Sequence, residues 1–237
     1  VKFHGRVSLQ LRASGALKLL MADCTDDGGM RALARFEPEQ MLGMHDFAEM
    51  ASGGVLTMTV EPSGGGRMWQ GIVPIEGNGM ADAVSTYFDQ SEQLPTRVEL
   101  AVTDTRAAGV LVQKLPGEAD DDDGWNRVGR LLDTVGEAEL LGTDAETLLQ
   151  RLFHEERRRL FPPRALRFFC PCSRERVARV LRGLGADELD SLVETQGEVD
   201  VRCEFCNEQY RFDPLDVERL LRSDLPERDD DEPGSVH

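Results

Sequence analysis

Two cysteine motifs, Cys170-Pro171-Cys172 and Cys203-Glu204-Phe205-Cys206, lie near the end of this 237-residue chain and decide the fold of its last third. Four thiolates in two close pairs are the ligand set of a closed tetrahedral zinc site. Each short loop can bring two sulfurs to about 2.3 Å from one metal ion. The sequence therefore predicts that Cys170, Cys172, Cys203 and Cys206 bind one Zn²⁺.

The residues around these motifs predict a small zinc-binding domain over 166–221. Apolar residues at helical spacing indicate two short helices between the motifs: Val177, Val180, Leu181 and Leu184, then Leu189, Leu192 and Val193 after an opening Asp187. Alternation from Val199 to Phe212 places the second motif at a hairpin tip. Asp213 and Pro214 predict the start of a last helix, over 215–221. Because so small a unit has little core, its folding should depend on the metal.

Residues 1–115 predict a strand-rich α+β core domain. Apolar and polar residues alternate from Val7 to Met21 around a turn at 13–15, which is typical of a β-hairpin. Further strands are expected at 28–36, 55–60, 67–75, 97–103 and 109–114. One helix is expected over 80–90, and Pro95 should end that helical stretch. Cys24 stands at the end of a predicted strand, where we expect a small, buried, apolar side chain.

The composition changes abruptly at Pro116, which is soon followed by an acidic run at 120–123. Two helices are expected after it, over 125–135 and 143–158, before a pair of prolines at 162 and 163. The second helix has an apolar stripe beside a charged face, formed by Leu148, Leu149, Leu152 and Phe153. We therefore expect a helical linker over 116–165. Residues 222–237 are acidic and nearly free of apolar side chains, and should be a disordered tail.

Charge and hydropathy limit the partners of this chain. Its 27 basic residues face 44 acidic ones, a formal charge of −17, which would repel a phosphate backbone. The segment 164–212 carries eight Arg, no Lys and nine acidic residues, so the cysteine region has no net basic surface. No apolar run approaches the ~18 residues of a membrane helix, and the first residues do not resemble a secretory signal. We expect a cytoplasmic protein with no nucleic-acid or membrane partner.

At its cysteines the sequence resembles the heat-shock protein 33 family of redox-regulated chaperones. A C-x-C motif, a gap of residues 173–202 and a C-x-x-C motif are unusual among zinc ribbons, where two C-x-x-C pairs are the norm. The resemblance extends over most of the chain up to about Leu221. It also covers Gly71-Ile72-Val73-Pro74, Leu152-Phe153-His154-Glu155-Glu156, Tyr210-Arg211-Phe212 and the ten residues from Tyr87 to Thr96. The N-terminal start of the family pattern, which includes a strand and a helix of the core, precedes the part that matches Val1.

The resemblance implies a holdase chaperone that is inactive when reduced and zinc-bound. Oxidation would form the disulfides Cys170–Cys172 and Cys203–Cys206, release the zinc ion and unfold the linker. The unfolded linker would then hold unfolding client proteins and prevent their aggregation under oxidative or heat stress. Homodimerisation of the oxidised form is a further expectation.

The same residues allow other interpretations. A structural zinc-ribbon module that binds a protein without redox switching is the main alternative, and four inert buried thiols are a second. His154-Glu155-Glu156 begins like a zinc-protease helix but lacks the second His four residues on. The Gly-rich stretch 63–67 lacks the Lys-Ser or Lys-Thr of a phosphate-binding loop and predicts a hairpin loop. With no convincing nucleophile, base or open metal position, we expect that the protein is not an enzyme.

Overall fold

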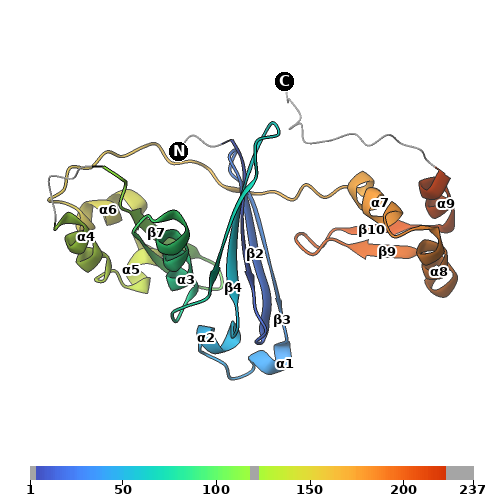
Figure 1. Ribbon diagram of the computed structural model, residues 1–237, viewed down its shortest axis with the longest axis horizontal. Coiled ribbons are helices and arrows are strands. Elements are labelled where there is room, and N and C mark those ends of the chain that lie inside the picture. The colour runs from blue at the N-terminus through green and yellow to red at the C-terminus, as the bar shows by residue number, and fades with distance from the viewer. Residues whose placement is uncertain (1–3, 118–122, 223–237) are drawn as a thin grey trace.

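The computed structural model describes residues 4–117 and 123–222, and its central element is a six-stranded sheet (Figure 1). The strand order is β5-β4-β1-β2-β3-β8. The strands are β1 (Gly5–Arg12), β2 (Leu17–Thr25), β3 (Gly29–Phe36), β4 (Val55–Pro62), β5 (Trp69–Pro74) and β8 (Arg167–Phe168). Neighbours are antiparallel except for β3 and β8, which run parallel. The predicted hairpin is confirmed as β1–β2, and the other strands expected in this region are present as β3, β4 and β5.

One face of this sheet is apolar, and one end of that face is buried. Leu11, Leu56 and Val73 occupy neighbouring strands in register and pack with Tyr87 of α3 (Met80–Tyr87). The short helices α1 (Pro38–Met41) and α2 (Phe47–Met50) connect β3 to β4. Leu11, Leu56, Val73 and Tyr87 belong to the first of three hydrophobic clusters in the described part of the chain, and Phe47 and Met50 of α2 pack against it.

Cys24 lies on this same apolar face but is exposed, so the expectation of a buried side chain is wrong. The register explains the difference. Cys24 is opposite Val7 on β1 and Met30 on β3, at the end of the sheet away from Leu11 and Leu56. The buried cluster is centred on the other end, so alternation predicted the face of the sheet correctly but not how far along it burial extends.

A second hydrophobic cluster joins a two-stranded sheet to the helices that follow it. The sheet consists of β6 (Thr96–Val102) and β7 (Ala107–Gln113), and the helices are α4 (Gly124–Leu132), α5 (Glu137–Gly142) and α6 (Ala145–Leu152). Ala101 packs in this cluster with Leu132, Leu140 and Leu148. The apolar stripe of the predicted second helix therefore does face a core, one that it shares with β6 and β7.

The predicted helices differ from the observed ones in several places. The helix expected over 80–90 is α3 followed by a single π turn, η1 (Phe88–Glu92), which ends at Gln93 with a left-handed φ of 56°. The helix expected over 143–158 ends at Leu152 because no apolar residue continues its buried stripe after Phe153. Helix α5 was not predicted at all. The glycine-rich stretch is the loop between β4 and β5, as expected, with Gly64 and Gly65 at positive φ.

The third cluster forms the core of the unit that carries the cysteines. Helices α7 (Arg174–Arg182), α8 (Ala186–Gln196) and α9 (Pro214–Arg222) pack against the hairpin of β9 (Val199–Arg202) and β10 (Gln209–Phe212). Helix α8 follows Gly185 rather than opening at Asp187, whereas Asp213 caps α9 as predicted, accepting a hydrogen bond from the Asp216 amide at 2.7 Å. We call residues 166–221 the cysteine unit. Figure 1 shows it beside the central sheet, with the β6–β7 part on the other side.

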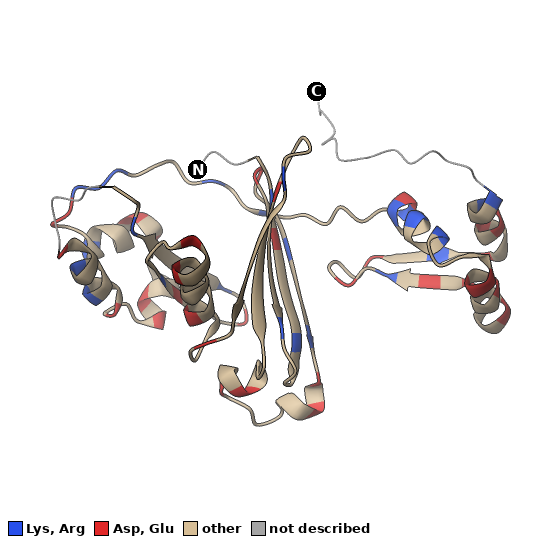
Figure 2. Cartoon of the chain, in the orientation of Figure 1, with Lys and Arg blue, Asp and Glu red and all other residues tan. Residues whose placement is uncertain are grey.

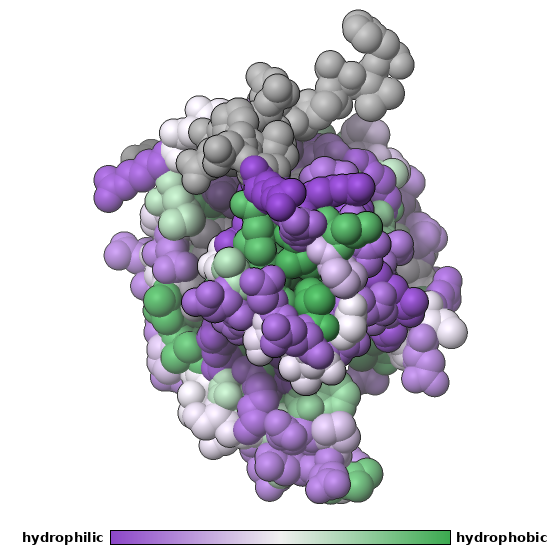
Figure 3. Space-filling model, turned by 90° about the vertical axis from the view of Figure 1, so that its right-hand side faces the viewer, coloured by the Kyte–Doolittle hydropathy of each residue, from purple (hydrophilic) through white to green (hydrophobic). Residues whose placement is uncertain are grey.

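Figure 3 shows the outer side of the cysteine unit, where apolar side chains gather between charged ones. None of the helices in the described residues is long and apolar enough to cross a membrane. The acidic tail expected over 222–237 lies, apart from its first residue, outside the described residues, as do residues 118–122 of the expected linker. The observed α+β fold, with a strand-rich core and a C-terminal cysteine cluster, agrees with the predicted fold class.

Candidate metal centre

The first pair of cysteines lies between the central sheet and α7. Cys170 comes two residues after the end of β8, and Cys172 directly precedes Ser173, which caps α7 by accepting a hydrogen bond from the Arg176 amide. An extended segment and a helix start therefore hold Cys170 and Cys172 from both sides. The intervening Pro171 limits the conformations of the short connection.

The second pair lies at the tip of the β9–β10 hairpin, as the alternation predicted. The tip is closed by two backbone hydrogen bonds, Cys203 N to Glu208 O at 2.9 Å and Asn207 N to Cys203 O at 2.8 Å. Asn207 adopts a left-handed φ of 60°, a conformation that Asn tolerates better than most residues. This tight turn presents both sulfurs to the same side.

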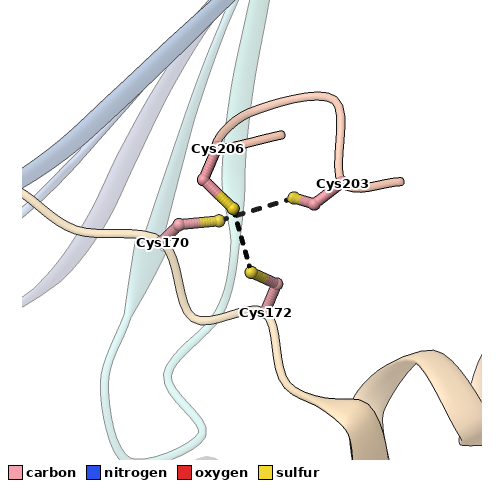
Figure 4. A group of neighbouring side chains, drawn as sticks. All are labelled: Cys170, Cys172, Cys203 and Cys206. Carbon is pink, nitrogen blue, oxygen red and sulfur yellow. Dashed lines mark hydrogen bonds between the residues drawn. The ribbon is translucent and has the colours of Figure 1, made fainter. Parts of the chain in front are cut away.

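The structure brings all four predicted sulfurs together, although the two pairs are about 30 residues apart in the sequence (Figure 4). Every Sγ lies within 4.8 Å of the other three. Two of the separations are 3.2 Å, between Cys172 and Cys206, and 3.7 Å, between Cys170 and Cys203. Each of these two contacts joins one cysteine of the first motif to one of the second, so the cluster ties the hairpin tip to the segment before α7.

Three of the cluster thiols have shifted pKa values, and the shifts differ in direction. Burial raises the pKa of Cys203, but backbone amides of Cys206 and Phe205 and neighbouring thiols lower it to about 7. Burial is also the main cause that raises the pKa of Cys170. For Cys206, the Glu208 amide lowers the pKa, but hydrogen bonds with other thiols and burial raise it to about 12. Of these three, Cys203 is therefore the thiol that most readily becomes a thiolate, the form that binds metals.

Three residues around the sulfurs were not singled out from the sequence. The Tyr210 hydroxyl donates a hydrogen bond to Cys172 Sγ at 3.2 Å. Arg31, on β3 of the central sheet, directs its Nη1 toward Cys170 Sγ at 3.8 Å, and its guanidinium lies 3.9 Å from the centre of the Phe205 ring. Tyr210 and Phe205 could have been noticed from their closeness to the motif. No local pattern points to Arg31, which is far away in the sequence.

A closed cluster of four sulfurs can hold a metal ion. Thiolates are soft ligands, and an all-sulfur tetrahedral set suits zinc or an iron–sulfur centre rather than Mg²⁺ or Ca²⁺. For a tetrahedral ion with sulfurs at about 2.3 Å, neighbouring sulfurs would be about 3.8 Å apart. The observed separations, from 3.2 Å up to 4.8 Å, bracket that value. The residues therefore fit a single tetrahedral ion with little rearrangement.

His154 does not take part in this centre. Its Nδ1 contacts the backbone oxygen of Arg151, and its Nε2 is 3.8 Å from the Glu155 carboxylate. Within the described residues, the four cysteines are the only group of three or more Cys, His, Asp or Glu side chains close enough to share an ion.

Comparison with known proteins identifies relatives of this chain. A family model described as Hsp33 protein matches residues 1–213. The "33 kDa chaperonin" of Methylobacillus flagellatus is 44% identical over 223 residues, covering 93% of this chain and 75% of the relative. The "33 kDa chaperonin" of Azotobacter vinelandii is 43% identical over 227 residues, covering 93% and 76%. The crystal structure of the 33 kDa chaperonin (heat shock protein 33 homolog) from Thermotoga maritima has a similar fold. Its TM-score is 0.79 at 21% identity, covering 93% of this chain and 79% of that one.

Proposed function

The chain belongs to the Hsp33 family of chaperones, and from this premise we propose that it is a redox-regulated holdase. In the reduced state, Cys170, Cys172, Cys203 and Cys206 bind one Zn²⁺ and the chaperone is inactive. Oxidation forms the disulfides Cys170–Cys172 and Cys203–Cys206, releases the zinc ion and unfolds the linker over 116–165. The unfolded linker then binds unfolding client proteins and prevents their aggregation.

The observation that carries this proposal is the four-sulfur cluster. It takes ligands from two distant segments, so a bound ion joins the segment before α7 to the hairpin tip. Loss of the ion would remove that joint, because apparent zinc-binding free energies of about 10–16 kcal/mol become folding free energy in small zinc domains. Formation of each disulfide removes two electrons from a pair of thiolates. One hydrogen peroxide per disulfide accepts these electrons, its O–O bond breaks and two hydroxide ions are released.

The proposed linker has features that favour release after oxidation. Helices α4, α5 and α6 are short, and their core is shared with only two strands. Residues 157–166 follow without helix or strand, and Phe161 is 72% exposed in this stretch. A segment that mixes apolar side chains with many charges can bind unfolding chains and still remain in solution.

The main alternative is a structural zinc centre without redox switching. A structural centre predicts that the thiolates stay bound to zinc in the presence of peroxide. Redox switching predicts that the thiolates are oxidised and the zinc ion is released. We further propose a cytoplasmic location, homodimerisation of the oxidised form, and no enzymatic activity, nucleic-acid partner or membrane partner.

The test is a parallel measurement of zinc content, free thiols and client aggregation on the purified chain. The reduced protein should contain one zinc per chain and should not suppress aggregation of a heat-unfolded client. After peroxide at heat-shock temperature, zinc and the four cluster thiols should be lost together as suppression appears. Zinc that survives oxidation, or suppression that does not depend on it, would leave a structural centre only.

A further inference from the structure

Arg31 connects the central sheet to the cysteine cluster, and we propose that it is a positioning residue that docks the reduced cysteine unit on the sheet. In this role Arg31 holds Cys170 and Phe205 together while Cys170 is a thiolate, and the contact weakens when Cys170 enters a disulfide. The proposal rests on the metal-binding part of the proposed function. Beyond that function, the proposal names the contact that links the oxidation state of the sulfurs to the position of the cysteine unit on the sheet.

A ladder of polar side chains across three strands fixes Arg31. Ser8, Asp23 and Arg31 are direct cross-strand neighbours on β1, β2 and β3. The Ser8 hydroxyl donates to Asp23 Oδ1 at 2.6 Å, and Arg31 donates to Asp23 Oδ2 from Nε at 2.8 Å and from Nη2 at 2.7 Å. The side chains of Asp23 and Arg31 are only 5% and 16% exposed. This arrangement leaves Nη1 as the guanidinium nitrogen that is not engaged with Asp23.

The free end of Arg31 contacts both halves of the cysteine site. Nη1 approaches Cys170 Sγ, in the first motif, at 3.8 Å. The guanidinium plane covers the ring of Phe205, in the second motif, with Cζ 3.9 Å from the ring centre. A planar guanidinium can donate hydrogen bonds at its edge and bind an aromatic ring with its face, which a lysine ammonium cannot do in the same way. One side chain thus holds two segments that the metal also joins.

The backbone brings Cys170 to this position. Strand β8 pairs in parallel with β3, with Phe168 opposite Met30. The Arg167 amide donates to Gly28 O and the Phe169 amide donates to Met30 O, each at 2.9 Å. Cys170 is the next residue and emerges beside Arg31. An ion pair between Arg35, also on β3, and Glu204 supports the same contact, but both side chains are more than half exposed and such pairs contribute little. Figure 2 shows the basic residues of β3 on the strand nearest the cysteine unit.

The chemistry of sulfur makes this contact sensitive to oxidation. A guanidinium donates a charge-assisted hydrogen bond to a thiolate, and such bonds are stronger than those to neutral acceptors. When hydrogen peroxide takes two electrons from the Cys170 and Cys172 thiolates, an S–S bond forms and the peroxide O–O bond breaks to give two hydroxide ions. The sulfur of Cys170 then carries no charge. The nearly buried Asp23–Arg31 pair loses its anionic partner in the cysteine unit, and closing the second disulfide would move Phe205.

The test compares three variants of the reduced, zinc-loaded full chain, and a fourth variant, Arg31→Lys, keeps the positive charge but not the planar guanidinium. Arg31→Ala removes the docking group, and Phe205→Leu removes the ring from the other side while leaving the sheet untouched. Arg6→Ala is the matched control, because it removes an ion pair with Glu61 from the same sheet without contact to the cysteine unit. Zinc content, hydrogen exchange at the Arg167 and Phe169 amides, and the rate of zinc release by peroxide are measured for each.

We expect all three variants to retain one zinc per chain. In the Arg31→Ala and Phe205→Leu variants, the amide hydrogens of Arg167 and Phe169 should exchange roughly tenfold faster than in the parent chain. The β9–β10 amides should remain protected. Arg31→Ala should also release zinc several-fold faster, because Cys170 loses a hydrogen-bond donor that stabilises its thiolate. Arg31→Lys should restore part of the slow release but not the full protection. Arg6→Ala should match the parent chain.

Equal exchange and equal release rates in Arg31→Ala and Arg6→Ala would overturn the proposal. So would loss of zinc from Arg31→Ala, which would make Arg31 part of the stability of the metal site rather than a docking group. A parent chain that binds no zinc, or that keeps its zinc in peroxide, would instead contradict the proposed function. The two failures are therefore distinguishable.

Discussion

Replacing Leu189 with alanine should make the folding of the cysteine unit fully dependent on its metal ion. Leu189 is completely buried and packs with Leu181, Phe212 and Val217 in a cluster of only six buried residues. Leu→Ala at such a site costs about 2–5 kcal/mol. At about 3 kcal/mol, the equilibrium constant for opening the unit rises by a factor of about 150.

The metal should mask this loss. An apparent zinc-binding free energy of about 10–16 kcal/mol exceeds the cost of the substitution several-fold. The zinc-loaded Leu189→Ala chain should therefore protect the amides of β9 and β10 almost as well as the parent chain. After chelation, the variant should lose that protection far more completely than the chelated parent chain, because its remaining core is too small to fold alone.

Hydrogen exchange with and without chelator, resolved for β9–β10 and for β1–β2, is the suitable assay. Leu184→Ala is the matched control, because Leu184 lies in the same unit but is 46% exposed and should cost under about 1 kcal/mol. Equal exchange of β9–β10 in the chelated variant and the chelated parent would refute the reasoning. A comparable acceleration in β1–β2 would also refute it, since it would show that the clusters do not open separately.

Three further predictions concern the cysteines, an exposed carboxylate and the central core. Cys203→Ser should weaken zinc binding by more than about 100-fold in a chelator competition. Mutation of residues that only hydrogen-bond to metal ligands already lowers metal affinity by about 10–100-fold. Asp27 has a pKa lowered from 3.8 to about 2, mainly by hydrogen bonds from Thr25 and Arg167. Its stabilising contribution should therefore be complete above about pH 4 and disappear as the pH falls toward 2, and a carboxyl NMR titration that finds an ordinary pKa would contradict this. Gly71→Ala should destabilise the chain by about 1–3 kcal/mol in urea unfolding, because the new Cβ would lie 2.5 Å from the Tyr87 hydroxyl. Gly142→Ala, which meets no atom within 4 Å, should not destabilise it.

Local patterns predicted most of the secondary structure and the four clustered sulfurs. Alternation at period two was sufficient for β1 and β2, and motif spacing was sufficient for the cysteines, because both depend on residues close together in the chain. The predictions failed where tertiary packing decides. Helix α6 ends where its buried stripe ends, and Cys24 is exposed because the apolar face is covered only in part.

The docking of the cysteine unit could not be predicted for the same physical reason. Strand β8 has only two residues, which is too short for any periodic pattern. Arg31 contacts Cys170 across 139 residues of sequence, and an arginine on a strand usually faces water. The contact becomes visible only when the sheet places Asp23 beside Arg31 and the parallel pairing brings Cys170 to them.

The parallel pairing of β3 with β8 also has a consequence for synthesis of the chain. Strand β3 pairs with β2 through a short turn, so the β2–β3 hairpin can form early. The other edge of β3 can pair with β8 only after residues 167 and 168 have been synthesised. Closing so long a loop is slow compared with forming a hairpin. During that interval β3 presents an open edge of the kind that pairs with other chains. The segment that leads to the cysteines therefore also covers the Gly29–Met30 end of that edge once it has been synthesised.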